Sequence, residues 1–185
     1  MTGRLLIAGV GNIFLGDDGF GVEVASRLAT ADLPDWVRVA DYGIRGMHLA
    51  YDLAGGYSSA ILVDATARGG APGTIYLIEP DVASRPEPAE ADDAAVAASP
   101  LFNAHGMQPD VVFSVLGMLG AGTRQILVVG CEPASVEYGI GLSEPVAAAV
   151  GQAAAVVLDL VARAAATDDH QLAMKEWAYV PRDSR

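Results

Sequence analysis

Short apolar runs alternate with amphipathic segments along the first part of this chain, and the alternation predicts the order of strands and helices. Residues 4–10 (RLLIAGV) form a continuous apolar run that ends in glycines, which is typical of a buried strand in a parallel sheet. Apolar residues then recur at helical spacing over residues 19–31. A strand, a helix and a strand are expected in turn at residues 37–42, 47–54 and 59–65. This pattern predicts an α/β fold.

The second half of the chain changes this regular order. The segment TIYLIEP (74–80) reads as a strand, but the link before it is too short to hold a crossover helix. We therefore expect this strand to run antiparallel to the preceding one or to splay away from it, within a mixed sheet. A helix over residues 109–121, a strand over 125–131 and a long helix over 143–166 follow, the last with Ser143 as N-cap.

Two segments do not fit the predicted core. Residues 80–100 are rich in proline and acidic residues, and their alanines offer no large apolar face, so we expect an acidic mobile loop there. Residues 167–185 are interpreted as a C-terminal tail. The prediction is thus a single domain over residues 1–166 with that tail.

Composition narrows the class of protein. The 185 residues include 23 acidic and 11 basic side chains, and the net charge of −12 argues against nucleic acid or an anionic membrane surface as partner. Cys131 is the only cysteine, so neither an intrachain disulfide nor a thiol metal cluster is expected, and a reducing cytoplasm fits best. No apolar stretch is long enough, without charges, to predict a transmembrane helix or a cleaved leader.

The segment GVGNIFLGDDGFG (9–21) first suggests a dinucleotide-binding turn, because glycines follow a predicted strand. Phe14, however, occupies the place of the third glycine. Asp17 and Asp18 lie where a pyrophosphate would need free N–H groups, and they would repel it. A nucleotide-dependent oxidoreductase is therefore kept only as an alternative.

The same two acids are suited to holding a cation, although one of them is expected to cap the helix that follows. Asp64 ends the apolar strand ILVDA, where a carboxylate needs hydrogen-bond donors or a metal. Because ligands bind outside the carboxyl ends of strands in open α/β sheets, Asp18 and Asp64 are expected to face one crevice. The structural alternative is that Asp64 only caps the backbone of its own turn with Thr66.

His105 precedes the predicted helix at residues 109–121 and is one of three histidines. An imidazole and two carboxylates would suit nickel or zinc and leave coordination positions open. The spacing of residues 18, 64 and 105 forms no local motif, so the pattern alone does not bring them together. By contrast, Cys131 is expected in the core rather than as a nucleophile, and His48 at a surface or packing position.

Several segments together resemble the nickel-iron hydrogenase maturation endopeptidases. They are GVGNIFLGDDGFGV, LVDA followed by GGAPGT, the histidine at position 105, and VGCEPASVEYGIGLSEPV. The similarity covers residues 4 to about 163, although DYGIRG (41–46) departs from the DGGTxG of many members. It implies a three-layer α/β/α fold with a mixed five-stranded sheet, order 2-1-3-5-4, in which strand 4 is antiparallel. It also implies that Asp18, Asp64 and His105 are the metal-contacting and catalytic residues.

The resemblance further implies the activity and the partner. The expected reaction removes a C-terminal extension from the hydrogenase large-subunit precursor after nickel insertion. The nickel then belongs to the substrate and serves as the recognition signal. Either a metal or a carboxylate would activate the water, and the sequence does not choose between them. A non-catalytic nickel-binding accessory protein remains a second alternative.

Overall fold

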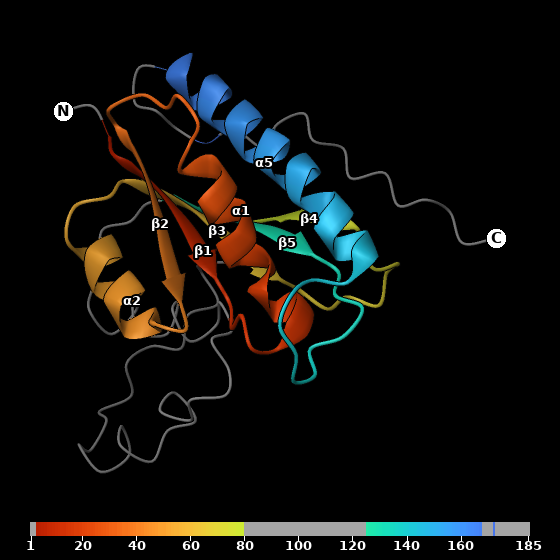
Figure 1. Ribbon diagram of the computed structural model, residues 1–185. Coiled ribbons are helices and arrows are strands. Elements are labelled where there is room, and N and C mark those ends of the chain that lie inside the picture. The colour runs from red at the N-terminus through yellow and green to blue at the C-terminus, as the bar shows by residue number, and fades with distance from the viewer. Residues whose placement is uncertain (1–2, 80–124, 168–171, 173–185) are drawn as a thin grey trace, which may run out of the picture.

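A mixed sheet of five strands, in the order β2-β1-β3-β5-β4, lies between two layers of helices in the computed structural model (Figure 1). The structure describes residues 3–79, 125–167 and 172. The strands are β1 (Leu5–Val10), β2 (Val37–Gly43), β3 (Ser59–Ala65), β4 (Ile75–Ile78) and β5 (Gln125–Cys131). The helices are α1 (Phe20–Leu28), α2 (Gly46–Ala54) and α5 (Glu144–Ala165), and a short 3₁₀ helix, η1 (Gly16–Gly19), precedes α1.

The strand pairing confirms the expected topology. β1 pairs in parallel with β2 and β3, and β3 pairs in parallel with β5. β4 is antiparallel and pairs with β5, so it lies at the sheet edge rather than beside β3. The short link after β3 therefore carries the chain past the place that β5 later fills.

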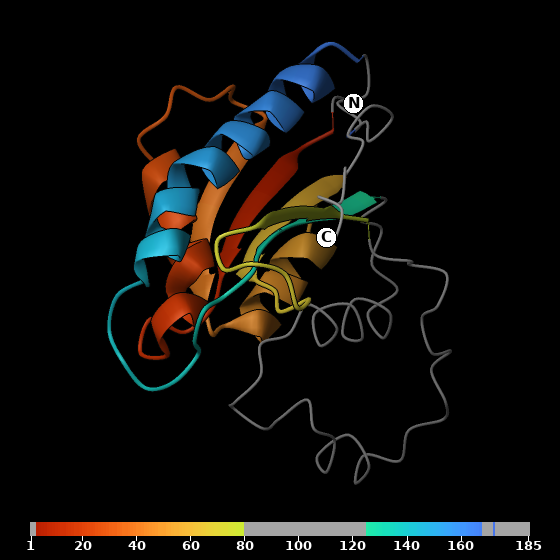
Figure 2. The same ribbon diagram turned by 90° about the vertical axis from the view of Figure 1, so that its right-hand side faces the viewer.

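Both faces of the sheet are covered, which explains why the strands read as continuous apolar runs. Figure 2 shows α1 and α5 on one face and α2 on the other. On β1, Leu5 and Ile7 pack with the α1 and α5 side, whereas Leu6 and Ala8 pack with the α2 side. Successive side chains of a strand point to opposite faces, so this strand contributes to two core clusters.

The long helix α5 is apolar because it forms much of the first cluster. Val146, Val157 and Leu160 are fully buried there. By length and composition α5 could also cross a membrane, but a buried core helix passes the same test, and its packing on α1 and the sheet accounts for its apolar face.

The predicted boundaries agree with the described elements to within a few residues. The main difference is at the first helix, which was expected over residues 19–31 but spans Phe20–Leu28 and is preceded by the 3₁₀ helix η1. The expected helix at 109–121, the expected acidic loop at 80–100 and nearly all of the expected tail lie outside the described residues. Those expectations, and the division into a domain and a tail, stay predictions.

Candidate active site

The carboxyl ends of β1 and β3 meet at one edge of the sheet and place Asp64 there. Val63 pairs with Gly9 in the parallel register, so Asp64 lies level with Val10, the last residue of β1. The strand is buried from Ser59 to Asp64, and Asp64 is only 4% exposed. A carboxylate at this point is therefore largely removed from water.

Close backbone packing brings Asp18 to the same edge. A Cβ atom on Gly21 would lie 2.1 Å from the carbonyl oxygen of Val63 and 2.3 Å from that of Val10. Only glycine permits this approach of the first turn of α1 to the two strand ends. Asp18 lies three residues before Gly21, and Asp64 directly follows Val63, so the contact sets the two carboxylates close together.

The two carboxylates affect each other electrostatically. Burial raises the pKa of Asp64 well above its ordinary value, the negative charge of Asp18 raises it further, and a hydrogen bond from the Ala65 N–H only partly offsets this. Burial also raises the pKa of Asp18, although the backbone N–H of Asn12 donates to its Oδ2 at 2.6 Å. The pair is therefore suited to holding a proton where isolated aspartates would be ionised.

Within residues 3–79, 125–167 and 172, neither carboxylate forms an ion pair with lysine or arginine. The same residues contain no group of three potential metal ligands. The expected capping role of Asp64 is present in part, as the Ala65 bond shows, but the Thr66 hydroxyl is buried without a hydrogen-bond partner. His105 lies outside the described residues, so its place beside the two aspartates stays a prediction.

Asp17, the neighbour of Asp18, has a different role. It is 1% exposed, and its carboxylate accepts hydrogen bonds from the backbone N–H groups of Ala134, Ser135 and Ser143 at 2.6–3.1 Å and from the Ser143 hydroxyl at 2.9 Å. Burial alone would raise the pKa of Asp17, but these hydrogen bonds hold it below its ordinary value. Asp17 therefore joins η1 to the loop at residues 132–143.

The expectation that Asp17 or Asp18 caps the following helix is wrong. Neither η1 nor α1 has a side-chain cap, and Gly19 occupies the N-cap position of α1. Ser143 is the N-cap residue of α5 by position, yet its side chain makes no capping bond. Its hydroxyl donates to Asp17 instead, because that buried carboxylate needs donors.

Glu132 is a second buried carboxylate with a structural role, and this role could not be assigned from the sequence. It accepts hydrogen bonds from the Tyr76 hydroxyl at 2.7 Å and from the backbone N–H groups of Arg68 and Gly69 at 2.8 and 3.1 Å. Burial would raise its pKa, but these donors lower it. It thereby fixes the link between β3 and β4. An acid directly after an apolar strand, as at Asp64, was the available signal.

The remaining candidates behave as expected from their sequence context. Cys131 is fully buried in the core, and burial raises the pKa of its thiol to about 12, so the thiolate is disfavoured. His48 is exposed on α2.

Known proteins share both the sequence and the fold. The sequence model of the hydrogenase maturation protease family matches residues 22–160. The hydrogenase 2 maturation protease of Escherichia coli K12 is 31% identical over 157 residues, covering 84% of this chain and 88% of its own. The hydrogenase expression/formation protein HupM of Azotobacter chroococcum is 32% identical over 167 residues, covering 88% of this chain and 75% of its own.

A solved structure gives the same result. The hydrogenase 2 maturation peptidase of a Thaumarchaeota archaeon is 31% identical, with a TM-score of 0.62 over 84% of this chain and 96% of its own. The sheet order and the shared sequence thus place this chain in a class of peptidases. The chain belongs to the hydrogenase maturation protease family. This assignment decides against the nucleotide-dependent oxidoreductase.

Proposed function

We propose that this peptidase removes the C-terminal extension of a nickel-iron hydrogenase large-subunit precursor after nickel insertion. The names of its relatives, which include a hydrogenase 2 maturation protease, support a hydrogenase as the partner. The family resemblance of the sequence supports the C-terminal cut and the use of nickel as a signal. The cytoplasm, where precursors are made, is the proposed location.

The observation that carries this proposal is the pair of the half-buried Asp18 and the buried Asp64, which lacks a cationic partner among the described residues. A nickel ion presented by the precursor would supply the missing positive charge. It would thereby favour the ionised form of one carboxylate of the pair, against the effect of burial, while the other keeps its proton. A precursor without nickel would offer no such compensation, so the pair would distinguish the two forms.

The same pair can perform the proton transfers of peptide hydrolysis. One ionised carboxylate can accept a proton from the attacking water, while its protonated neighbour can donate to the scissile group, as two coupled acids with separated pKa values do. We assign Asp64 and Asp18 to these roles together with contact to the substrate's nickel. His105 is proposed as the third contact. An ionised Asp64 beside nickel also fits activation of the water by that metal.

The proposal is tested by incubating the protein with nickel-loaded and nickel-free precursor and measuring the product by mass spectrometry. We expect a shortened product only from the nickel-loaded form. Asp64→Asn should lower the cleavage rate by about 10²–10⁴-fold while the circular dichroism spectrum stays unchanged. Full activity of this variant would contradict the assignment of Asp64 as a catalytic residue. Stable binding of loaded precursor without any cleavage would instead support the accessory protein.

A further inference from the structure

Exposed large apolar side chains gather at the edge of the sheet that carries Asp18 and Asp64. Within the described part of the chain, all but Tyr51 and Leu158 lie in loops or at a helix start at this end. Five of them occupy two loops, and we call this set the apolar rim: Ile13 (45% exposed), Phe14 (58%), Val136 (50%), Tyr138 (88%) and Ile140 (84%). Such a concentration of exposed apolar surface commonly marks a binding site.

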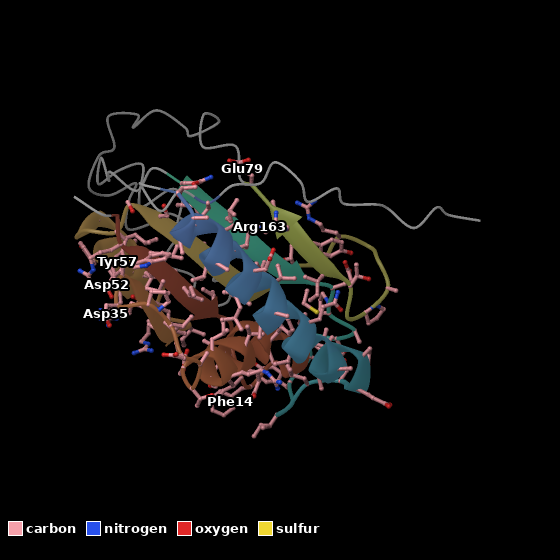
Figure 3. The ribbon with its side chains drawn as sticks, turned by 90° about the horizontal axis from the view of Figure 1, so that it is seen from above. Phe14, Asp35, Asp52, Tyr57, Glu79 and Arg163 are labelled. Carbon is pink, nitrogen blue, oxygen red and sulfur yellow. The ribbon has the colours of Figure 1, made fainter. Side chains whose placement is uncertain are left out.

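The two loops that carry the rim are joined to each other by their backbones. The Gly139 N–H donates to the Phe14 carbonyl at 3.0 Å, and the Gly16 N–H donates to the Gly139 carbonyl at 3.0 Å. In Figures 1 and 2 the loop after β5 lies beside the segment around η1 at the same end of the molecule. Figure 3 places Phe14 at the outer edge of this segment. The rim is therefore one surface built from residues far apart in the sequence.

Asp17 fixes the backbone of the loops that carry the rim. Its four hydrogen bonds attach the loop at residues 132–143 to η1, so the apolar side chains project from a fixed backbone. A surface that is ordered before binding loses less entropy when a partner docks. Exposure of Tyr138 and Ile140 on an ordered loop is therefore consistent with a docking role.

The rim lies next to the carboxylate pair. Asn12 donates its backbone N–H to Asp18, and Ile13 and Phe14 are the next two residues of the chain. A polypeptide whose scissile bond reaches Asp18 must therefore pass next to this loop. Glu137 is the only charged residue in the two loops, at residues 12–16 and 133–143, although the whole chain has a net charge of −12. Apolar rather than basic segments of a partner fit this surface.

We propose that the apolar rim binds an apolar segment of the hydrogenase large-subunit precursor adjacent to the scissile bond, and so contributes to substrate affinity. This inference rests on the proposed function. It assigns Phe14, Tyr138 and Ile140 to substrate binding rather than to chemistry. Tyrosine and other large apolar side chains often contribute most to the affinity of such surfaces.

The test measures the Kd of fluorescently labelled, nickel-loaded precursor for the Asp64→Asn protein, in which cleavage does not interfere. Adding Tyr138→Ser with Ile140→Ser should weaken binding by about 10- to 100-fold. Phe14→Ser alone should weaken it in the same direction, because the rim spans both loops. The matched control is Tyr51→Ser with Leu158→Ser, which replaces similar exposed residues on α2 and α5, outside the rim.

A second readout uses the same substitutions in the cleaving protein. KM should rise while kcat changes by less than about threefold, and the thermal unfolding midpoint should stay that of the parent, since these side chains are exposed. An unchanged Kd, an equal loss in the control, or a fall in kcat alone would overturn the inference. Absence of cleavage by the unsubstituted protein would instead contradict the proposed function. If the Asp64→Asn protein does not bind the precursor, the loss reflects the nickel contact of Asp64, and an unchanged KM of the rim variants in the cleaving protein would then overturn the docking inference.

Discussion

Carboxylates that are buried or, at Asp18, half-buried occupy two regions at the same edge of the sheet, and they differ in the number of hydrogen-bond donors around them. The anchor region contains Asp17 and Glu132, each of which accepts several hydrogen bonds and has a lowered pKa. The pair region contains Asp18 and Asp64, each of which has one backbone donor and a raised pKa. Asp17 and Asp64 have similarly low exposure. The number of hydrogen-bond donors around each carboxylate therefore distinguishes an acid with a structural role from one suited to proton transfer.

The largest expected difference between the regions is in activity. Asp18→Asn should lower the cleavage rate by about 10²–10⁴-fold, because an amide cannot exchange the proton. The free energy of unfolding should stay the same or rise, since the amide oxygen can still accept from Asn12 and no charge is buried. Kinetic assays measure the cleavage rate, and urea unfolding measures the free energy of unfolding. As a control, Asp159→Asn removes a half-exposed carboxylate on α5 and should leave the rate unchanged.

Asp17→Asn should have its main effect on stability. It replaces an acceptor oxygen by an N–H₂ group that faces the donors of the 134–143 segment. Loss of hydrogen bonds to a buried carboxylate should lower the free energy of unfolding by about 3 kcal/mol. Urea unfolding monitored by circular dichroism measures this. If Asp18→Asn were the more destabilising of the two substitutions, the division into anchor and pair would be wrong.

Glu132→Gln should be destabilising by about 2 kcal/mol near pH 7, because it weakens hydrogen bonds to a charged acceptor. The effect should depend on pH. The ordinary glutamate value is 4.5, and in the folded protein the pKa of Glu132 is lower. The stability that Glu132 contributes is thus fully present at a pH above its pKa in the unfolded chain. It is lost as the pH falls through its pKa in the folded protein.

The variant should therefore lose less stability than the parent protein as the pH falls below the ordinary glutamate pKa of 4.5. Unfolding curves at several pH values compare the two proteins. If the free energy of unfolding falls equally with pH in both proteins, the Glu132 carboxylate does not have the lowered pKa. Tyr76→Phe removes one donor to Glu132 and should show a smaller loss at neutral pH, of about 1 kcal/mol.

The smallest expected effect is an increase in stability. The Thr66 hydroxyl, two residues after Asp64, is buried and has no hydrogen-bond partner in the described part of the chain, so it resembles the pair region rather than the anchor region. Thr66→Val should raise the free energy of unfolding by about 1 kcal/mol, since it removes an unsatisfied polar group while nearly preserving shape. A thermal shift measures the gain. A loss of stability would show that the hydroxyl is satisfied after all.

The sequence pattern was sufficient to predict the strands and a mixed sheet, and the family resemblance supplied their order. The continuous apolar runs reflect the two covered faces, and the short link after residue 65 predicted a strand that is antiparallel or splays away. Asp64 could be selected because a carboxylate at the end of an apolar strand needs a partner. The pairing of β4 with β5 instead of β3 could not be predicted from the short link, because it depends on where a strand some fifty residues later is inserted.

The roles of Asp17 and Asp18 could not be separated from the sequence alone. Both are adjacent acids before a helix, and the donors that distinguish them come from residues 134–143, more than a hundred positions away. Local rules therefore favoured capping, which neither provides. Glu132 shows the same limit, because its donors at Arg68 and Gly69 are 64 and 63 positions away in the chain. Sequence pattern identifies acids that need partners, but not which partners they obtain.

The hydrogen bonds at Asp17 have one further consequence, for how this family diversifies. Three of the four donors are backbone N–H groups, which every residue except proline provides, and only Ser143 contributes a side chain. The anchor thus places few demands on the identity of residues 136–142 beyond the shape of the loop. Mutations there can accumulate without loss of the fold. Exchange of this loop between relatives is therefore an accessible evolutionary route to a new precursor, and a practical one for engineering.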